Sequence, residues 1–459
     1  MREDTIVAIS TPYGNGGIGI IRISGDDAFS IASKIFKGKK SFSDIKSHTI
    51  NYGKIIDAEK NEVLDEVLLS KMKAPNTFTR EDIIEINTHG SQIVLKNILE
   101  LVIKMGARIA EPGEFTKRAF LNGRIDLSQA EAVMDLINSK TDNSQKSAIS
   151  QLEGRLSKKL STIRKKLIEL IAHIEVTVDY PEYDIDEVTQ NEIDESLEFA
   201  RNEIVNLLET YEQGRILRDG VNMVIVGKPN VGKSSLLNGL SGKDKAIVTN
   251  IPGTTRDVIE EYINVEGIAI KLIDTAGIRE TADVVEKIGV TRSKEEVEKA
   301  DLVVFLADAS TGLTKDDIDI LESIKDKNIV VLLNKIDLTN DTDKVKKQIK
   351  EIADADILEV SILNDIGIEA FTKYIKNKFI SGKINLNSEV LLTNVRHKNL
   401  LDKAKENITN AINAGNMGMP LDMITIDIKE AAYNLGEITG ESVNDLILHE
   451  IFSKFCVGK

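Results

Sequence analysis

The sequence predicts a protein of mixed class, in which an N-terminal α+β domain precedes a discontinuous all-α domain with a doubly wound α/β domain inserted into it. Three patterns lead to this prediction: β-branched runs near the N-terminus, apolar residues every three or four positions before residue 218 and after residue 380, and strands alternating with helices between them. A chain of 459 residues is too long for one core, at about 100–200 residues per domain. The expected segments are 1–118, 119–218, 219–379 and 380–459, the second and fourth forming one helical domain.

Three stretches of the N-terminal domain have strand patterns, and one has helical spacing. β-branched and apolar residues predict strands at 5–10, 19–24 and 82–87, and the spacing predicts a helix at 93–105. Gly14–Gly19 satisfies G-x-G-x-x-G after a strand, but residues 20–24 have the pattern of a second strand, whereas a dinucleotide fold requires a helix there. We therefore expect a glycine turn in a β-hairpin.

The next hundred residues are predicted to be helical. Apolar residues from Ile149 to Ile174 recur every three or four positions, which predicts one long helix, and the segment around Pro181 breaks it. A second helical run is expected from about residue 192 to 218. The other faces of the long helix are basic, and composition favours a solvated face over an RNA-backbone patch for Arg155, Lys158, Lys159, Arg164, Lys165 and Lys166.

The inserted domain alternates short apolar strands with helices, and the C-terminal segment is helical again. Strands are expected at 223–226, 271–273, 302–306, 329–333 and 357–360. This alternation is typical of a parallel, doubly wound sheet.

Composition excludes several classes of protein. With 59 basic and 74 acidic side chains the net charge is −15, which argues against a surface covered in nucleic-acid-binding charge. One cysteine excludes a disulfide framework and a cysteine-rich zinc site. No apolar run approaches the ~18 residues of a membrane span, and the first residues lack a signal peptide's apolar stretch, so we expect a cytoplasmic protein.

A phosphate-binding loop is predicted between the strand at 223–226 and a helix starting near Ser235. Residues 227–234 match G-x-x-x-x-G-K-[ST]. The glycines let backbone N–H groups surround a β-phosphate at a helix N-terminus. Lys233 is expected to reach the β- and γ-phosphates, and the Ser234 hydroxyl to bind Mg²⁺.

Three further elements follow at the ends of later strands. Asp274-Thr275-Ala276-Gly277 is expected to hold Mg²⁺ through water and to sense the γ-phosphate, and Thr255 is the candidate second Mg²⁺ ligand. Asn334-Lys335-Ile336-Asp337 supplies a carboxylate that accepts hydrogen bonds from guanine, and the backbone of Ser361-Ile362-Leu363 is expected to close over the base. Adenine lacks the matching donors, so these four elements in order predict a GTPase.

The position after Gly277 holds Ile278, where Ras-type enzymes place a water-orienting glutamine. An isoleucine cannot polarise water, so another group must do so. Arg279, Glu280 and Glu286 follow closely, although each taken alone is more often a solvated charge.

These motifs resemble a known family. The phosphate loop, Gly253-Thr-Thr-Arg-Asp257 and Asp274–Glu280 resemble the Era-like translational GTPases. The opening Asp4–Pro12, the block Pro112–Asn122 and the terminal Phe455-Cys-Val-Gly-Lys459 are similar to the MnmE (TrmE) family of tRNA modification GTPases, along essentially the whole chain.

The resemblance implies a folate-binding dimerisation domain, a helical domain and an inserted Ras-like G domain. It implies a homodimer that works with an MnmG-type, FAD-containing partner, as a heterotetramer, on the wobble uridine (U34) of certain tRNAs. In that chemistry a formyl- or methylene-tetrahydrofolate supplies one carbon, and C5 receives a (carboxymethyl)aminomethyl group. No membrane is involved.

The resemblance also implies a potassium-stimulated hydrolase in which K⁺ provides the charge of an arginine finger. Asn230, Thr249, Ile251 and Thr254 match the positions around K⁺, and Glu286 takes the water-orienting role. With Lys233 as the other catalytic residue, the expected nucleotide-binding residues are Asn230, Val231, Gly232, Lys233, Ser234, Ser235, Thr249, Asn250, Ile251, Pro252, Gly253, Thr254, Thr255, Asp274, Thr275, Ala276, Gly277, Asn334, Lys335, Asp337, Ser361, Ile362 and Leu363. The family usually has alanine where Ile362 stands, and a backbone contact tolerates that change.

For folate, the matching positions are Arg22, Glu85, Arg124 and Lys459. A carboxylate suits the donor edge of a pterin, and cations suit the anionic glutamate tail. Without the resemblance, Arg22 has the pattern of an exposed edge charge. Two interpretations of Cys456 stay open: a small hydrophobic side chain, or a role beside the folate.

Two other functions compete with that of a tRNA-modifying GTPase. A ribosome-assembly GTPase of the Era group would bind rRNA through a domain after the G domain, but residues 380–459 contain no evident RNA-binding motif. A folate-binding scaffold with vestigial nucleotide binding is disfavoured because Lys233, Asp274 and Asp337 are all present.

Overall fold

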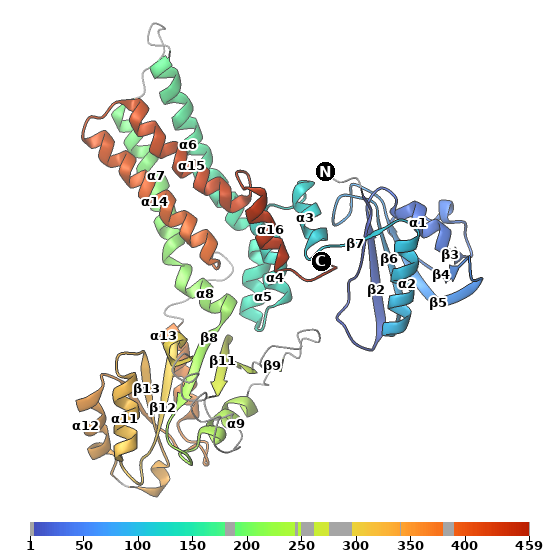
Figure 1. Ribbon diagram of the computed structural model, residues 1–459. Coiled ribbons are helices and arrows are strands. Elements are labelled where there is room, and N and C mark those ends of the chain that lie inside the picture. Colours follow the sequence, from blue (N-terminus) through green and yellow to red (C-terminus); the bar gives the residue numbers. More distant parts are fainter. Residues whose placement is uncertain are drawn as a thin grey trace.

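The computed structural model describes residues 4–179, 189–243, 247–248, 261–274, 296–339, 341–379 and 390–458. Figure 1 shows three units: a mixed α/β unit formed by the N-terminal residues, an elongated helical unit, and a second α/β unit that joins the helical unit through α8 (Tyr211–Asp219). This arrangement confirms the predicted fold class. The expected boundary at residue 118 falls inside α3 (Glu114–Leu121), which begins beside the N-terminal sheet and leads into the helical unit.

The N-terminal unit contains a seven-stranded sheet in the order β3-β4-β5-β6-β2-β1-β7. Two helices, α1 (Ala28–Ile35) and α2 (Gln92–Lys104), share an apolar core with the sheet. A single 3₁₀ turn, η1 (Phe42–Asp44), follows β3. The strands are β1 (Ile6–Ile9), β2 (Gly16–Ser24), β3 (Phe36–Gly38), β4 (Thr49–Asp57), β5 (Glu62–Met72), β6 (Ile83–Gly90) and β7 (Arg108–Ile109).

The glycine-rich segment near residue 16 belongs to a β-hairpin, as predicted. β1 and β2 are antiparallel, with Ile6 opposite Ser24. Gly16 and Gly90 face each other at the start of β2, and a Cβ on Gly90 would lie 2.4 Å from the Gly16 carbonyl oxygen. The glycines therefore allow two backbones to approach closely, and no dinucleotide-binding helix follows them.

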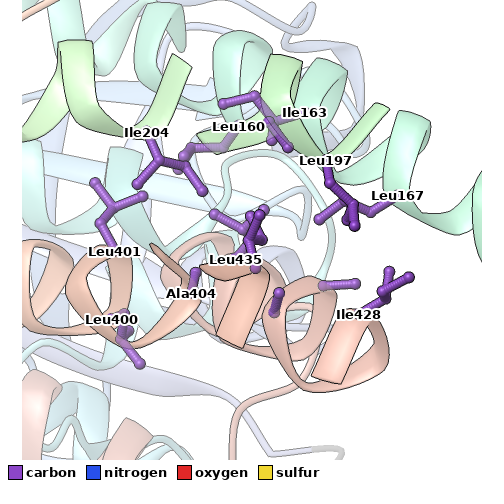
Figure 2. Packing of buried hydrophobic residues seen from close by; sticks show 14 of the residues in the cluster. Leu160, Ile163, Leu167, Leu197, Ile204, Leu400, Leu401, Ala404, Ile428 and Leu435 are labelled. Carbon is purple, nitrogen blue, oxygen red and sulfur yellow. The ribbon is translucent and has the colours of Figure 1, made fainter. Parts of the chain in front are cut away.

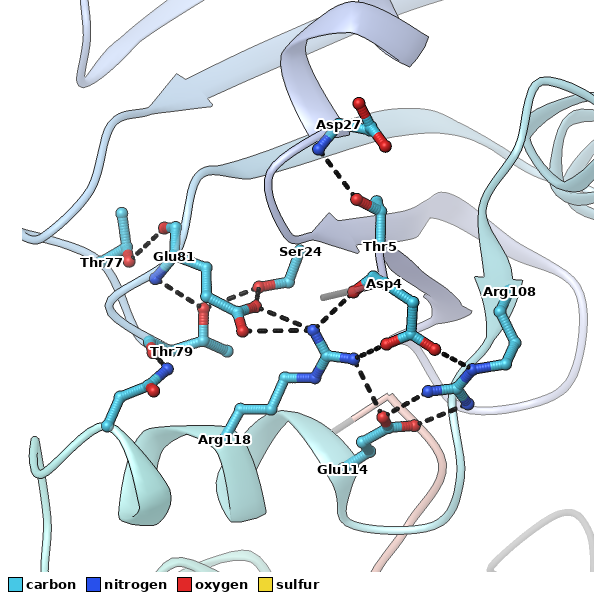
Figure 3. A network of polar contacts seen from close by, with 11 residues as sticks. Asp4, Thr5, Ser24, Asp27, Thr77, Thr79, Glu81, Arg108, Glu114 and Arg118 are labelled. Carbon is cyan, nitrogen blue, oxygen red and sulfur yellow. Dashed lines mark hydrogen bonds and ion pairs between the residues drawn. The ribbon is translucent and has the colours of Figure 1, made fainter. Parts of the chain in front are cut away.

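A network of ion pairs attaches α3 to this sheet (Figure 3). Asp4 accepts from Arg108 Nε and from Arg118 Nη2, both at 2.7 Å, and hydrogen bonding to Arg108 holds the pKa of Asp4 below its ordinary value. Arg108 and Arg118 both contact Glu114, and Arg118 also reaches Glu81 at 3.1 Å. Phe115 of α3 is consequently held against the face of the sheet opposite α2, where it packs with residues of β1.

The helical unit packs around one long apolar core (Figure 2). Leu160 and Leu167 of α6 meet Leu197 of α7, and Leu401 of α14 and Leu435 of α15 complete the layer. Segments separated by the whole inserted unit thus share one core. The helices are α4 (Leu127–Ile137), α5 (Asp142–Leu152), α6 (Arg155–Asp179), α7 (Gln190–Glu209), α8, α14 (Val395–Asn416), α15 (Leu421–Thr439) and α16 (Asp445–Ser453).

The prediction of one long helix through Ile149 was wrong at its start. α5 ends at Leu152 and α6 begins at Arg155, because Gly154 between them has φ +76, a left-handed conformation that ends a helix. Ile149 is 39% exposed and lies outside the apolar core. The second helical run is also divided, at Thr210 between α7 and α8.

Most of the basic side chains of α6 have partners within the molecule. Lys159 pairs with Glu203 at 3.1 Å, Arg164 pairs with Glu441, and the Lys166 ammonium lies 4.7 Å from the centre of the Phe199 ring. Two further pairs are Arg155–Glu153 and Lys165–Glu169. These contacts favour the paired, solvated face over an RNA-backbone patch.

The second sheet has the order β14-β13-β12-β8-β11-β10-β9 and carries apolar clusters on both faces. Five strands are parallel, as predicted, but β10 is antiparallel to both of its neighbours, β11 and β9. The difference arises at Glu266 (φ +52) and Gly267 (φ +87), a two-residue turn that folds β10 back onto β11. The strands are β8 (Val221–Val226), β9 (Ile247–Val248), β10 (Glu261–Val265), β11 (Ile268–Asp274), β12 (Leu302–Asp308), β13 (Ile329–Asn334) and β14 (Asp356–Glu359).

Helices of this unit connect the parallel strands, which places the turns after β8, β12, β13 and β14 at one edge of the sheet. They are α9 (Lys233–Lys243), α11 (Lys315–Ile324), α12 (Asp343–Ile352) and α13 (Ile368–Phe379), with a 3₁₀ turn η2 (Ile336–Leu338) after β13. Within the described ranges no helix combines the length and the apolar character that a membrane crossing needs.

Candidate nucleotide site and N-terminal site

The phosphate loop lies between the end of β8 and the start of α9. Gly227 (φ +149), Asn230 (φ +64) and Gly232 (φ +109) adopt conformations that bend the loop back on itself. A Cβ on Gly227 would lie 2.4 Å from the Leu306 carbonyl oxygen, and one on Gly232 would lie 2.5 Å from Asn334 Nδ2. Neighbouring groups therefore leave no room for a larger side chain at either position. The helix begins at Lys233, two residues earlier than expected.

Lys233 bridges the mouth of this loop. Its ammonium donates to the carbonyl oxygens of Gly227 at 2.6 Å and Lys228 at 2.8 Å. Ser234 and Ser235 follow it, exposed in the first turn of α9, where backbone N–H groups have no partner within the helix. Cationic and N–H donors thus converge on one small region, which suits an anion.

Asn334 connects the phosphate loop with the loop after β14. At the buried end of β13, its Nδ2 donates to the Val231 carbonyl at 2.8 Å, and its Oδ1 accepts from Ile362 N at 3.1 Å. Asp337 lies in η2 beside it and accepts from Ser361 Oγ at 2.6 Å. Hydrogen bonds therefore connect three of the four sequence motifs, namely the phosphate loop, Asn334–Asp337 and Ser361–Leu363.

Lys335 and Leu363, from the two motifs predicted to contact the guanine base, do not join this set of hydrogen bonds. Lys335 has φ +65, and its ammonium pairs with Asp308 at 2.6 Å. Burial opposes ionisation of Asp308, but bonds from Lys335 and Ser310 outweigh it, and the pKa of Asp308 is lowered. Leu363 is 90% exposed, so its side chain contributes nothing to the packing of the loop.

Two ion pairs in this region were missed by sequence reasoning. Asp308 ends β12 and holds Lys335, and Asp317 of α11, 1% exposed, pairs with Lys228 of the phosphate loop at 2.7 Å. The signal for Asp308 was present, since it is a carboxylate at the end of a buried strand beside the other motifs. Asp317 had no such signal, because it lies in a helix of ordinary amphipathic pattern.

Several residues predicted to bind nucleotide, cations or folate are not among the described residues. For one of them, Asp274, only the backbone is described. Asp274 ends β11 and is paired in the sheet with Ile225, which puts its backbone beside the strand that leads into the phosphate loop. Its side chain is not described. The others are Thr249, Asn250, Ile251, Pro252, Gly253, Thr254, Thr255, Thr275, Ala276, Gly277, Glu286 and Lys459, together with Ile278, Arg279 and Glu280.

A second group of charged residues lies in the N-terminal unit. Arg22 of β2 pairs with Glu85 of β6 at 2.8 Å, and its Nη1 donates to the Gly458 carbonyl at 3.0 Å. The Arg22 guanidinium also lies 5.6 Å from the centre of the Phe115 ring. β2 lies inside the sheet, between β6 and β1, and the Arg22 side chain is 17% exposed. The interpretation of Arg22 as an exposed edge charge is therefore wrong.

Arg124, three residues after the end of α3, lies near the apolar cluster that contains Phe115. It donates to the Phe78 carbonyl at 3.1 Å and lies over the Phe78 ring, which packs against the cluster that contains Phe115. Burial, helped by Arg80, lowers the pKa of Arg124. Cys456 is exposed, and its carbonyl accepts from Gly113 N, so the thiol is not a packed hydrophobic side chain.

No group of three or more His, Cys, Asp or Glu side chains suited to a metal ion occurs in the described part of the chain.

Comparison with known sequences assigns the chain to a family. Residues 127–456 match the family model described as MnmE helical domain, and residues 5–124 match that described as GTP-binding protein TrmE N-terminus. The tRNA modification GTPase MnmE of Acetivibrio thermocellus is 60% identical, and that of Bacillus mycoides 50% identical, each over all of both chains. Among solved structures, Aquifex aeolicus Era bound to GDP and AlF₄⁻ is 30% identical, with a TM-score of 0.28, over 41% of this chain and 66% of that one.

The two family models together cover most of the chain, including the phosphate loop. The curated relatives align with it from end to end. The chain belongs to the MnmE family of tRNA modification GTPases.

Proposed function

We propose that this protein hydrolyses GTP and uses the reaction in modifying the wobble uridine of tRNA. The single observation that carries the first part is Asn334, whose side chain joins the phosphate loop to the loop after β14. A polar bridge between these two loops is what a nucleotide requires, because phosphate and base must be held at a fixed separation.

Guanine specificity is assigned to Asp337. Its carboxylate is exposed and is oriented through one oxygen by Ser361 Oγ. Such a carboxylate accepts from both N1–H and the 2-amino group of guanine, whereas adenine offers neither donor. Guanine binding would remove water from this carboxylate, so a base without the two donors would leave it unpaired and would bind more weakly.

Mg²⁺ is expected to be held by Ser234 and Thr255, with Asp274 acting through water. The Ser234 hydroxyl is exposed at the N-terminus of α9, and hydroxyl and carboxylate oxygens suit this hard cation. When bound, the ion neutralises charge on the β- and γ-phosphates. The residues of the chain orient the phosphates through Lys233 and the loop N–H groups.

K⁺ is expected beside the same loop, at Asn230, Thr249, Ile251 and Thr254. Asn230 is exposed in the phosphate loop and has a left-handed backbone conformation. When bound, the ion supplies positive charge near the leaving phosphate. Glu286 is proposed to orient the attacking water in place of the absent glutamine.

The ion requirement is tested by GTP turnover in K⁺ and in Na⁺. We expect faster turnover in K⁺, and Asn230→Ala should remove that preference while leaving GDP affinity nearly unchanged. The matched control is Asn238→Ala, an exposed asparagine further along α9. Equal wild-type rates in the two salts would refute the potassium role.

The role of Glu286 is tested separately. Glu286→Ala should lower kcat without weakening nucleotide affinity, because oriented water matters only in the chemical step. A fall in GDP affinity of the same size as the fall in kcat would instead assign Glu286 to binding.

The tRNA reaction is proposed to need a second copy of the chain, an MnmG-type FAD-containing partner and formyl- or methylene-tetrahydrofolate. Arg22, Glu85, Arg124 and Lys459 are the proposed folate-binding residues. The first two are already paired across β2 and β6, and Arg124 flanks the same aromatic cluster, so a planar ring could be held there between charge and ring faces. Unmodified U34 in a deletion strain, restored by the wild-type gene, is the expected result.

The ribosome-assembly alternative finds no support in the described residues after the G domain. α14 and α15 contribute to the apolar core of the helical unit, and α16 packs beside α3 and α4. These helices complete existing units and leave no separate RNA-binding domain among residues 390–458.

A further inference from the structure

The edge of the N-terminal sheet opposite the C-terminus carries a basic hollow that the nucleotide and folate proposals do not use. It is open, has a volume of about 700 Å³, and is formed by α1, β3, η1 and one residue of β5. β3 is the edge strand on this side, whereas β1 and β7 mark the other edge, where Gly458 lies (Figure 1). The lysines that line the hollow, here called the lysine hollow, are Lys37, Lys39, Lys40 and Lys71.

The local charge contrasts with that of the whole chain. Residues 34–46 contain five lysines and one aspartate, in a protein of net charge −15. Lys37, Lys39 and Lys40 are exposed, and no carboxylate in the described part of the chain pairs with any of them. Two lysines elsewhere in the same unit do pair with carboxylates, Lys54 with Glu66 and Lys104 with Glu59.

Lys71 fixes a positive charge at the base of the hollow. Its ammonium lies 5.0 Å from the centre of the Phe29 ring and 4.7 Å from that of Phe42, and it donates to the Phe42 carbonyl at 3.3 Å. Two ring faces and one carbonyl hold the cation without neutralising its charge. The side chain is thus already ordered before any ligand arrives, which reduces the entropy lost on binding.

The lining combines the groups that contact nucleic-acid backbones. Phosphate oxygens are contacted mainly by lysine, arginine and hydroxyl side chains, and serines at 30, 33, 41 and 43 stand among the lysines. A lysine on an edge strand also prevents pairing with other chains, which is a sufficient account of Lys37 alone. It does not account for Lys39 and Lys40, which lie beyond the end of β3.

We infer that the lysine hollow is a contact surface for the phosphate backbone of tRNA, an inference that rests on the proposed tRNA-modifying function. Cations spaced along one open surface suit a polyanion whose charges are also spaced, and a single small anion would leave most of them unpaired. The hollow positions the substrate and takes no part in the chemistry.

The test compares tRNA binding by the full-length chain and two triple variants, using fluorescence anisotropy of a labelled tRNA transcript over a series of NaCl concentrations. K37A/K39A/K40A should weaken binding at least about tenfold near 0.1 M salt and reduce the slope of log affinity against log salt by about 2–3, since each phosphate contact contributes about 0.7–0.9. The matched control K344A/K347A/K350A removes three exposed lysines from α12 and should change neither quantity by that amount.

The outcomes separate this inference from the proposed function. Basal GTP hydrolysis without tRNA should be unchanged in both variants, which also shows that they fold, and Lys40→Glu alone should weaken tRNA binding in the same direction. Wild-type affinity in K37A/K39A/K40A, or an equal loss in the α12 control, overturns the lysine hollow while leaving the proposed function intact. A wild-type chain that hydrolyses GTP but binds no tRNA, alone or with its flavoprotein partner, overturns both.

Discussion

At the scale of single residues, one buried amide holds the candidate nucleotide site together. Asn334 satisfies the Val231 carbonyl and the Ile362 N–H at once, in a position only 4% exposed. Asn334→Ala leaves both groups without that partner, at a cost of about 1–3 kcal/mol. We expect GDP affinity to fall about 5- to 150-fold by calorimetric titration, since each ~1.4 kcal/mol is a factor of ten.

The control for that prediction lies at the other end of the same strand. Asn328 also donates from its side chain, to the Asp301 carbonyl at 2.8 Å, but it is exposed and far from the loops. Asn328→Ala should leave GDP affinity within about twofold of wild type. A similar loss in both variants would mean that the strand, and not the bridge, was damaged.

Motif spacing named the candidate residues of this site, whereas their hydrogen-bond partners could not be predicted. A motif with fixed spacing names Lys233, Asn334 and Asp337 because substrate chemistry dictates those residue types. The pairs Lys228–Asp317 and Lys335–Asp308 join residues 89 and 27 positions apart in the chain (317 minus 228, 335 minus 308). Such partners are set by how helices and strands pack, which no local pattern records.

At the scale of elements, a buried ion cluster joins α4 to the start of α14. Glu131 of α4, 8% exposed, accepts from His397 Nε2 at 2.7 Å, Arg396 Nη2 at 2.8 Å and Asn394 Nδ2 at 3.0 Å. Burial by itself would raise the pKa of Glu131, but the attraction of His397 and bonds from His397 and Arg396 prevail and lower it to about 2. Sequence reasoning assigned His397 no role, because its partner lies 266 residues away.

This cluster predicts how stability depends on pH. Since the folded pKa of Glu131 lies below its ordinary value of 4.5, its stabilisation is complete above that value and is lost as pH falls toward 2. Glu131→Gln should lower the free energy of unfolding by about 3 kcal/mol at pH 7 in urea titrations, because it removes the carboxylate that pairs with the Arg396 guanidinium and accepts from the His397 ring. The difference from wild type should shrink on acidification, and the exposed control Glu430→Gln should change little at either pH.

Elements themselves were predicted well where periodicity is long and missed where it is interrupted. The parallel strands and the α6 stripe were anticipated from apolar spacing. β4 and β5 were not predicted, although exposed residues such as Lys54 and Glu66 alternate there with buried ones, which is the pattern of a half-buried strand. The break at Gly154 depends on one backbone angle, which a continuous apolar stripe conceals.

At the scale of the whole molecule, the segment 455–458 is attached to the N-terminal sheet. Ser10 Oγ and Arg22 Nη1 both donate to the Gly458 carbonyl at 3.0 Å, and a Cβ on Gly458 would lie 2.5 Å from the Ile9 carbonyl oxygen. Gly458→Val should therefore release this segment. We expect faster tryptic cleavage after Lys454 and weaker folate binding, measured by mass spectrometry and by fluorescence quenching.

A second glycine separates crowding from backbone strain. Gly418 has φ +68 but no atom within 4 Å of its Cβ position, whereas Gly458 has φ +92 and is crowded. Gly418→Val should therefore introduce similar backbone strain, because valine disfavours a positive φ, but should change neither cleavage after Lys454 nor folate binding. If both variants behave alike, attachment of the terminal segment does not depend on close packing at Gly458.

The hydrogen bond between Ser10 and Gly458 joins residues 448 positions apart, so it can form only late in the synthesis of the chain. During translation at about 5–20 residues per second, Ser10 leaves the ribosome roughly 20–90 s before Gly458 is made. Throughout that interval the nascent N-terminal sheet lacks the carbonyl that Arg22 contacts in the finished chain. A truncated product of interrupted synthesis would therefore lack part of the proposed folate site, even if its sheet and its candidate nucleotide site had already folded.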